Sequence, residues 1–243
     1  MKSQTPFFIH ISKNAGTSVE EVFKSKGILL GRYDPFYKKH NLHWHTPPSA
    51  FTKCQKDLFQ KEISSKTTFI IHRSPFQRVL SEMNCKWGNP QKKNQGSRRK
   101  FNNNLRQYLI SVFLRRLHNK LYTLLVQLNF LNPVPRDHWI PQSHYLKYFS
   151  AESHKIKVVP FEFLSQGVSE IIGRQLTVPK INEQASSFKH DSSSISNLNK
   201  ALIILAYTDD LINHKRLLKK EQACVCSGLI TWKNFSFNSK WDR

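Results

Sequence analysis

The sequence predicts an α/β fold in which a central parallel sheet is flanked by helices. Two observations lead to this prediction. Short apolar runs alternate along the chain with helical patterns, as in proteins built from strand–helix–strand units. The chain has 243 residues, of which 39% are hydrophobic and 12% aromatic, so it can bury a substantial core. We therefore expect a single domain over residues 1–243.

Four apolar runs are predicted to be strands, because each is short and rich in Ile, Val or Phe. They are Phe7–Ile11, Ile28–Gly31, Thr68–His72 and Lys155–Val159. The first and third runs are each followed by a turn and a helical pattern, an order that favours a parallel sheet.

The predicted helices follow these strands or stand between them. One begins near Val19, and another covers Phe76–Met83 directly after Pro75, a residue favoured in the first turn of a helix. The longest helical pattern covers Leu105–Leu131, where apolar residues recur at three- to five-residue steps. The last covers Asn197–Lys220.

Basic residues dominate the chain, with 38 Lys and Arg against 16 Asp and Glu, a formal charge of +22. This excess predicts a polyanionic partner, namely a nucleotide, an acidic glycan, a nucleic acid or a membrane surface. Between Glu82 and Asp137 there is no acidic residue. The interval holds eleven basic ones: Lys86, Lys92, Lys93, Arg98, Arg99, Lys100, Arg106, Arg115, Arg116, Lys120 and Arg136. We interpret it as an anion-binding face and as a basic helical insert at about 86–132; the alternative is a solvated basic surface.

Cysteines and the N-terminus exclude several classes of protein. Cys54, Cys85, Cys224 and Cys226 have neither zinc-site spacing nor the density of a disulfide scaffold. The run Phe7–Ile11 is too short for a signal peptide or a membrane span. We expect no metal, no membrane span and a cytoplasmic chain, or one in the Golgi lumen if it is part of a longer, membrane-anchored enzyme.

The segment Phe8–Ser18 has the features of a phosphate- or sulfate-binding loop. A strand leads into small residues and Lys13, and then into a helix, so that backbone N–H groups and a helix N-terminus converge on one spot. Lys13 adds a full charge, and Thr17 and Ser18 add hydroxyl donors. It is not a Walker loop, because Lys13 precedes Gly16 instead of following the second glycine.

The segment Thr68–Ser81 repeats the order of strand, turn and helix. Arg73 stands at the carboxyl end of the predicted strand, where α/β sheets bind ligands. Ser81 follows about two helical turns later, and an Arg side chain and a hydroxyl can share one phosphate.

Together, the two segments resemble the Golgi-type carbohydrate sulfotransferases. Phe8–Ser18 is similar to the family's His-x-Pro-Lys-Thr-Ala-Gly-Thr-Ser loop, and Thr68–Ser81 to its Arg-Asp-Pro-x-x-Arg segment with a following Leu-x-Ser. The sequence departs from these patterns at Ser12, Asn14 and Ser74, which replace Pro, Thr and Asp.

The resemblance implies a sulfotransferase fold with a P-loop-like site for 3′-phosphoadenosine 5′-phosphosulfate (PAPS). The loop would hold the 5′-phosphosulfate through Lys13, Asn14, Ala15, Gly16, Thr17 and Ser18. Arg73 and Ser81 would hold the 3′-phosphate, with Arg78 assisting or pairing structurally.

A histidine cluster between the two motifs offers a general base. His40, His43 and His45 surround Trp44, and His has a suitable pKa for taking a proton from an alcohol near neutral pH. His43-Trp44-His45 resembles the His-x-His of 2-O-type uronyl sulfotransferases, which implies that His45, or else His43, is the base. The alternatives are structural histidines, or a metal site, for which the sequence shows no third ligand at a telling distance.

Further likenesses extend the resemblance over residues 6–215. Asp137–Gln142 resembles a His-x-x-Pro-Gln segment, and Lys157–Leu164 and Tyr207–Leu211 resemble two later family segments. The predicted reaction is in-line transfer of a sulfuryl group from PAPS to a hydroxyl of an acidic or polar carbohydrate, with PAP (adenosine 3′,5′-bisphosphate) as the product. The predicted acceptor-binding residues are Arg98, Arg99, Lys100 and His138.

Two rival functions remain open. A P-loop kinase-like phosphotransferase would need a Walker Lys and an Asp after the strand that ends at Arg73. A nucleic-acid-binding protein would use the basic interval with Trp87 and Phe101 as stacking residues. We expect a nucleotide cosubstrate and no specific nucleic acid.

Overall fold

A computed structural model describes residues 5–84, 97–131, 134, 138–151, 156–179, 191–223 and 230–231. The chain divides into two units, which are described separately. The first unit comprises Met1–Arg73, Pro141–Glu183 and Ile212–Arg243, and the second comprises Ser74–Ile140 and Gln184–Leu211.

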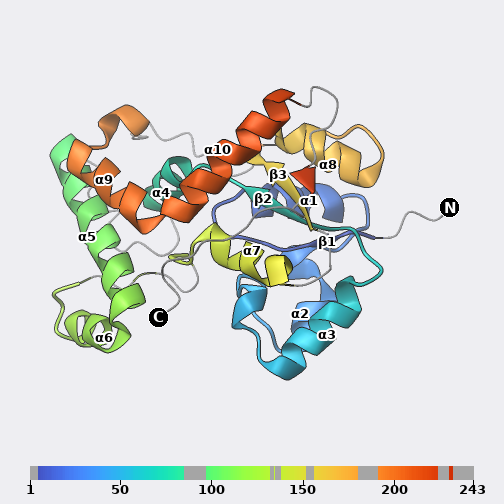
Figure 1. Ribbon diagram of the computed structural model, residues 1–243, viewed down its shortest axis with the longest axis horizontal. Helices are drawn as coiled ribbons and strands as arrows, with labels where there is room; N and C mark the ends of the chain where they lie inside the picture. Colours follow the sequence, from blue (N-terminus) through green and yellow to red (C-terminus); the bar gives the residue numbers. More distant parts are fainter. Residues whose placement is uncertain are drawn as a thin grey trace. The chain divides into compact units, whose positions relative to one another are not determined.

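The first unit is built on a small, mostly parallel sheet (Figure 1). Its strands are β1 (Phe7–Phe8), β2 (Thr68–His72), β3 (Ile156–Pro160) and β4 (Ile230–Thr231), in the order β1-β2-β3-β4. β1, β2 and β3 are parallel, and β4 runs antiparallel to β3. All five residues of β2 are buried, as expected for a strand covered on both faces. The predicted α/β class and the parallel sheet flanked by helices are therefore confirmed.

One face of the sheet is covered by α1 (Gly16–Lys24) and α8 (Leu164–Ile172). Phe8 of β1 stacks on Phe69 of β2 at 4.8 Å, and Val19 and Phe23 of α1 pack in the same cluster. Because successive residues of a strand point to opposite faces, the neighbouring Phe7 belongs to another layer.

The other face carries an aromatic cluster. Phe7 meets Phe36, Tyr37 and Phe59 with ring centroids 5.5 to 5.9 Å apart. These rings come from α2 (Pro35–Lys39) and α3 (Lys53–Ile63), and Tyr148 of α7 (Gln142–Ala151) joins them through Phe59. The 3-10 helices Gly31–Tyr33, Pro48–Ala50 and Phe161–Phe163 complete this unit.

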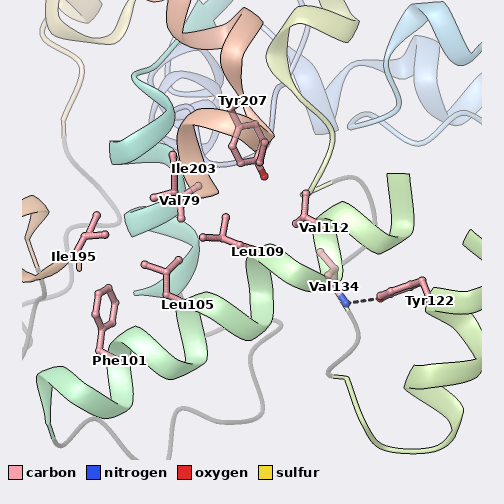
Figure 2. Close-up of a cluster of buried hydrophobic side chains, with 11 residues drawn as sticks. Val79, Phe101, Leu105, Leu109, Val112, Tyr122, Val134, Ile195, Ile203 and Tyr207 are labelled. Carbon is pink, nitrogen blue, oxygen red and sulfur yellow. Dashed lines mark hydrogen bonds between the residues drawn. The ribbon is translucent and has the colours of Figure 1, made fainter. Parts of the chain in front are cut away.

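The second unit is helical, and its core is shown in Figure 2. It contains α4 (Pro75–Met83), α5 (Arg98–Leu117), α6 (Asn119–Gln127), the 3-10 helix Ser192–Ser194 and α9 (Asn197–Ala206). α10 (Thr208–Ala223) begins in this unit and continues into the residues of the first. The buried stripe Leu105, Leu109 and Val112 of α5 packs with Val79 of α4 and Ile203 of α9.

Several predicted elements are confirmed. The strand Thr68–His72 has the predicted bounds, and α4 covers the predicted helix Phe76–Met83. The first strand is shorter than predicted and ends at Phe8, and the last described parallel strand begins at Ile156.

The predicted strand Ile28–Gly31 was wrong. Ile28 N–H donates to Phe23 O at 3.0 Å in a turn that follows α1, and Leu30 is buried in the core beside α1. Gly31, with φ of 54°, then starts a 3-10 helix. The apolar side chains of this connecting segment therefore pack in the core, and no strand among the described residues pairs with it.

The two longest predicted helices are each broken. His118 separates α5 from α6: its N–H donates to Leu114 O at 2.7 Å, and its Nδ1 accepts from Leu121 N–H at 3.1 Å. The break lets Tyr122 of α6 enter the core, where its hydroxyl accepts from Val134 N–H at 2.8 Å (Figure 2). Tyr207, which is buried, separates α9 from α10.

The predicted single domain, with an insert at about 86–132, stays a prediction. Residues 85–96, which include Lys86, Trp87, Lys92 and Lys93 of the basic interval, lie outside the described residues, as do Arg136 and Asp137. From residue 98 the insert forms α5 and α6 of the second unit. In the part of the chain that the structure describes, no helix is both long and apolar enough to cross a membrane.

Candidate anion-binding site

The loop after β1 has an unusual backbone that presents the start of α1. Lys13 and Ala15 adopt φ of 66° and 62°, the left-handed region, which is uncommon for residues with a Cβ. Such a conformation persists only where the surroundings enforce it, and it is concentrated at functional sites. Ala15 is the N-cap of α1, and its methyl group cannot accept a hydrogen bond. The cap side chain therefore does not occupy the N-terminus of α1, a position that suits an anion.

Gln142 fastens this loop to the end of β2. Its side chain is fully buried, and its Oε1 accepts from Asn14 Nδ2 at 2.5 Å and from Arg73 N–H at 2.9 Å. Its Nε2 donates to Arg73 O at 2.8 Å. Asn14 Nδ2 also donates to Ile71 O at 2.7 Å. Asn14 thus uses its side chain to shape the loop, and its predicted contact with the cosubstrate stays a prediction.

Arg73 brings its guanidinium to the backbone of the same loop. Its guanidinium donates to Lys13 O at 3.0 Å and lies over the ring of Phe161 at 4.2 Å. Lys13 and Arg73 are both half-buried, so their charges remain accessible to a ligand. β1 and β2 are parallel, so the loops after them share the edge of the sheet where α/β proteins bind ligands.

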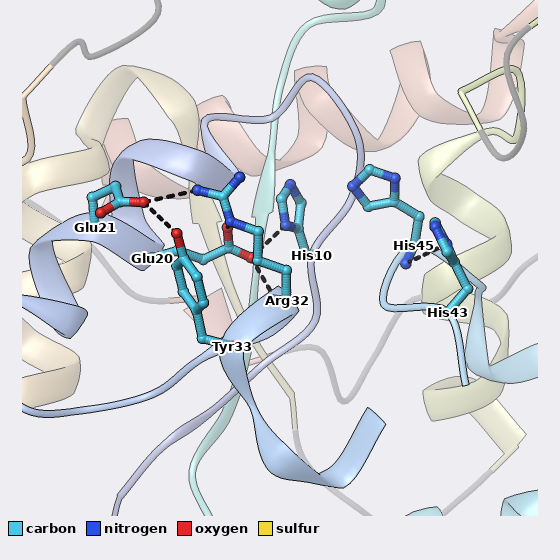
Figure 3. A network of polar contacts seen from close by, with 7 residues as sticks. All are labelled: His10, Glu20, Glu21, Arg32, Tyr33, His43 and His45. Carbon is cyan, nitrogen blue, oxygen red and sulfur yellow. Dashed lines mark hydrogen bonds and ion pairs between the residues drawn. The ribbon is translucent and has the colours of Figure 1, made fainter. Parts of the chain in front are cut away.

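A buried polar network lies behind the loop (Figure 3). His10 Nδ1 and Glu20 Oε1 are 2.6 Å apart, and both side chains are almost completely buried. The backbone N–H of Arg32 donates to Glu20 Oε1 at 2.8 Å, and the Arg32 side chain forms an ion pair with the same carboxylate, with Nε 3.1 Å from Oε2. A Cβ on Gly16 would lie 2.0 Å from His10 Nε2, so the start of α1 approaches this imidazole as closely as a glycine permits.

The candidate bases lie beside this network. The His45 ring stands edge-to-face on His10, with centroids 4.5 Å apart, and His43 Nδ1 accepts from His45 N–H at 3.3 Å. His43 stacks on Trp44 at 4.4 Å, and the Tyr145 hydroxyl donates to His45 O. His45 is half-buried. Among the described residues, no group of three His, Cys, Asp or Glu could hold a metal ion.

A second histidine pair lies under the end of β2. His72, fully buried, stacks on His214 with centroids 5.6 Å apart, and His214 Nε2 is 3.5 Å from Glu162 Oε1. Desolvation raises the pKa of Glu162, but the hydrogen bonds from His214 and from the backbone, together with the charges of His214 and His72, outweigh it, so the net pKa is lowered. His72, which directly precedes Arg73, is thus part of a buried polar cluster.

The other predicted site residues belong to the second unit. Ser81 is half-buried in α4. Arg78 is buried and donates to Ile140 O at 2.9 Å and to His138 O at 3.1 Å, so it has a structural role. His138 Nδ1 is 2.8 Å from Glu82 Oε2.

The basic triplet at the start of α5 is at the surface, with Arg98 and Arg99 exposed and Lys100 half-exposed. The Arg98 guanidinium donates to the carbonyl oxygens of Ser193 and Ser194 at 2.8 and 3.3 Å. The acceptor roles of these residues stay predictions.

Sequence reasoning missed His10 and Glu20 and left the role of Gln142 unspecified. The available signals were a histidine inside the apolar run Phe7–Ile11 and a glutamate on the buried side of the helix that follows.

No protein-family model matches the chain, and neither does any curated protein or solved structure.

Proposed function

We propose that this protein is a sulfotransferase that transfers a sulfuryl group from PAPS to a hydroxyl of a carbohydrate acceptor. One observation carries the proposal: the strained loop with Lys13, the start of α1 and Arg73 meet at the carboxyl ends of two parallel strands. These are the residues that the family resemblance assigns to the cosubstrate. Two basic residues beside a helix N-terminus favour an anionic ligand.

The residues of the site can each be given a role in the proposed transfer. PAPS supplies an activated sulfuryl group on a phosphate. Lys13 and the amides at the start of α1 would stabilise the negative charge that develops on the departing phosphate oxygen. Arg73 would bind the 3′-phosphate, and the predicted role of Ser81 stays a prediction from the sequence. His45, beside the loop through its contact with His10, would accept the proton of the acceptor hydroxyl.

Binding of PAP is the first test. PAP should raise the melting temperature of the protein, because it binds the native state alone, whereas ATP and an oligonucleotide should have smaller effects. Arg73→Ala should weaken PAP binding by about 2 kcal/mol, the scale of a charged hydrogen-bonded pair. Arg174→Ala is the matched control, because Arg174 is exposed in the same unit. Equal PAP affinity in the two variants would remove the 3′-phosphate assignment, and stabilisation by the oligonucleotide alone would favour nucleic-acid binding.

Turnover is the second test, with labelled PAPS and a panel of acidic glycans. Lys13→Ala should lower kcat more than it lowers PAP affinity, because charge on the leaving oxygen builds up in the transition state. His45→Ala should lower kcat by roughly 10²- to 10⁴-fold and leave PAP binding nearly unchanged. Near-normal turnover in His45→Ala would transfer the role to His43 or to another residue.

A further inference from the structure

His10 occupies the point where the phosphate loop and the candidate base meet (Figure 3). One edge of its imidazole faces the carboxylate of Glu20, at 2.6 Å from Nδ1. Its Nε2 faces Gly16 at the start of α1, and its ring touches that of His45. A single side chain thus contacts both halves of the proposed transfer site.

The contact with Glu20 fixes the orientation of the His10 ring. A carboxylate only accepts hydrogen bonds, so Nδ1 of His10 carries the hydrogen in this contact. Glu20 cannot turn away, because Arg32 binds it through two groups. Arg32 is itself held by Glu21 at 2.8 Å, and Glu21 accepts from the Tyr33 hydroxyl at 2.6 Å. This network leaves the imidazole of His10 one orientation, with Nε2 toward the loop.

Stability alone is a weak reason for such a network. Removing the Glu20 carboxylate and an imidazole from water costs free energy, and apolar residues of similar volume often stabilise a core as well or better. On one side the imidazole is covered by an apolar ring, that of Phe8, with ring centroids 5.8 Å apart. The position of the network, directly behind the strained loop, points to a role in the site.

We infer that His10 is a positioning residue for the proposed transfer, and that together with Glu20 it holds the ring of His45 in a fixed place beside the phosphate loop. The inference rests on the proposed function and adds a residue to it. His10 does not take the proton of the acceptor, because it is buried behind Gly16. It acts through His45, and its loss should therefore affect turnover more than binding of the cosubstrate.

A double-mutant cycle tests this dependence. His10→Ala should lower kcat by roughly 10- to 100-fold, as removal of a group that orients a functional histidine does, with a smaller change in the KM for PAPS. In a His45→Ala background the same substitution should lower kcat by less than about threefold, because residues that act as a unit are not additive. Full additivity would overturn the inference.

Two further variants separate positioning from folding. His10→Asn retains a donor for Glu20 but loses the ring that touches His45, so it should lose turnover while melting close to the parent. Phe23→Leu, a core change in the helix of Glu20, should lower the melting temperature and leave kcat of the folded protein unchanged. Normal kcat in a folded His10→Asn would also overturn the inference.

Nuclear magnetic resonance tests the same claim without turnover. The ring signals of His45, assigned by their loss in His45→Ala, should shift in His10→Asn and stay in place in Phe23→Leu. Unchanged His45 signals in His10→Asn would refute the positioning role. If the parent transfers sulfate to no acceptor while these signals shift as expected, the proposed function fails and the contact between the two histidines stands.

Discussion

Replacing Gln142 by Leu is the sharpest test of how the candidate site is assembled. This one buried side chain accepts from Asn14 Nδ2 and Arg73 N–H and donates to Arg73 O. The substitution keeps most of the side-chain volume and removes all three hydrogen bonds. The loop that carries Lys13 and the end of β2 that carries Arg73 then lose their common partner.

The cost follows from the groups left behind. Each buried polar group without a partner destabilises the native state by about 1–3 kcal/mol. The N–H and the carbonyl oxygen of Arg73 lose Gln142 as a partner, whereas Asn14 Nδ2 keeps Ile71 O as an acceptor, so we expect about 3–5 kcal/mol in total. For a chain of this size this corresponds to a fall in melting temperature of roughly 6–20 °C. PAP affinity should fall by about tenfold or more, because the two cations are no longer held in place.

The assay is thermal unfolding with and without PAP, with Gln166→Leu as the control. Gln166 is exposed in α8 of the same unit, and its Nε2 donates only weakly, at 3.4 Å, to Glu170. The control should change the stability by no more than about 0.5 kcal/mol. Gln142→Glu retains an acceptor but sets a carboxylate oxygen against Arg73 O in a fully buried place, so it should lower stability at least as much as Gln142→Leu. Equal melting temperatures for Gln142→Leu and Gln166→Leu would refute the assigned role of Gln142.

Three further predictions concern other parts of the chain. Gly16→Ala should destabilise the protein by about 1–3 kcal/mol, since its Cβ would meet the His10 ring, and His10→Ala in the same chain should restore part of the melting temperature. Burial raises the pKa of Asp34 from its usual value of 3.8, although the hydrogen bond from Phe36 N–H opposes this shift. The protonated Asp34 side chain is therefore favoured in the folded state, and the stability that it contributes is lost as the pH rises through the folded pKa. Asp34→Asn, which keeps an acceptor for the helix cap, should therefore melt above the parent near neutral pH, by a margin that shrinks at about pH 4; an equal margin at both would contradict the burial argument. Alanine at all three positions 98–100 should raise the acceptor KM and flatten its salt dependence, with little change in PAP affinity; an unchanged KM at low and moderate salt would exclude an acceptor role.

Local patterns determined several elements of this protein. The strand Thr68–His72 and the helix after Pro75 follow from a β-branched apolar run and a proline at the first turn, and both signals act over a few residues. The order of strand, Lys13, small residues and helix likewise predicted the loop that the structure shows at the start of α1. These features need no knowledge of distant residues.

Tertiary contacts decided the rest. The run Ile28–Gly31 has the composition of a strand, but a strand also needs a neighbour for its backbone groups, and here the segment packs Leu30 into the core. The helical pattern Leu105–Leu131 breaks at His118, where the gain is the burial of Tyr122.

The candidate site depends most on distant residues. Gln142 binds Asn14 across 128 positions of sequence, and His10 meets both Glu20 and His45 only because the loop, α1 and the turn before Pro47 converge. A sequence pattern shows which side chains can donate, accept or carry charge. Which of them become partners is decided when burial removes water, because each polar group must then find another inside the fold.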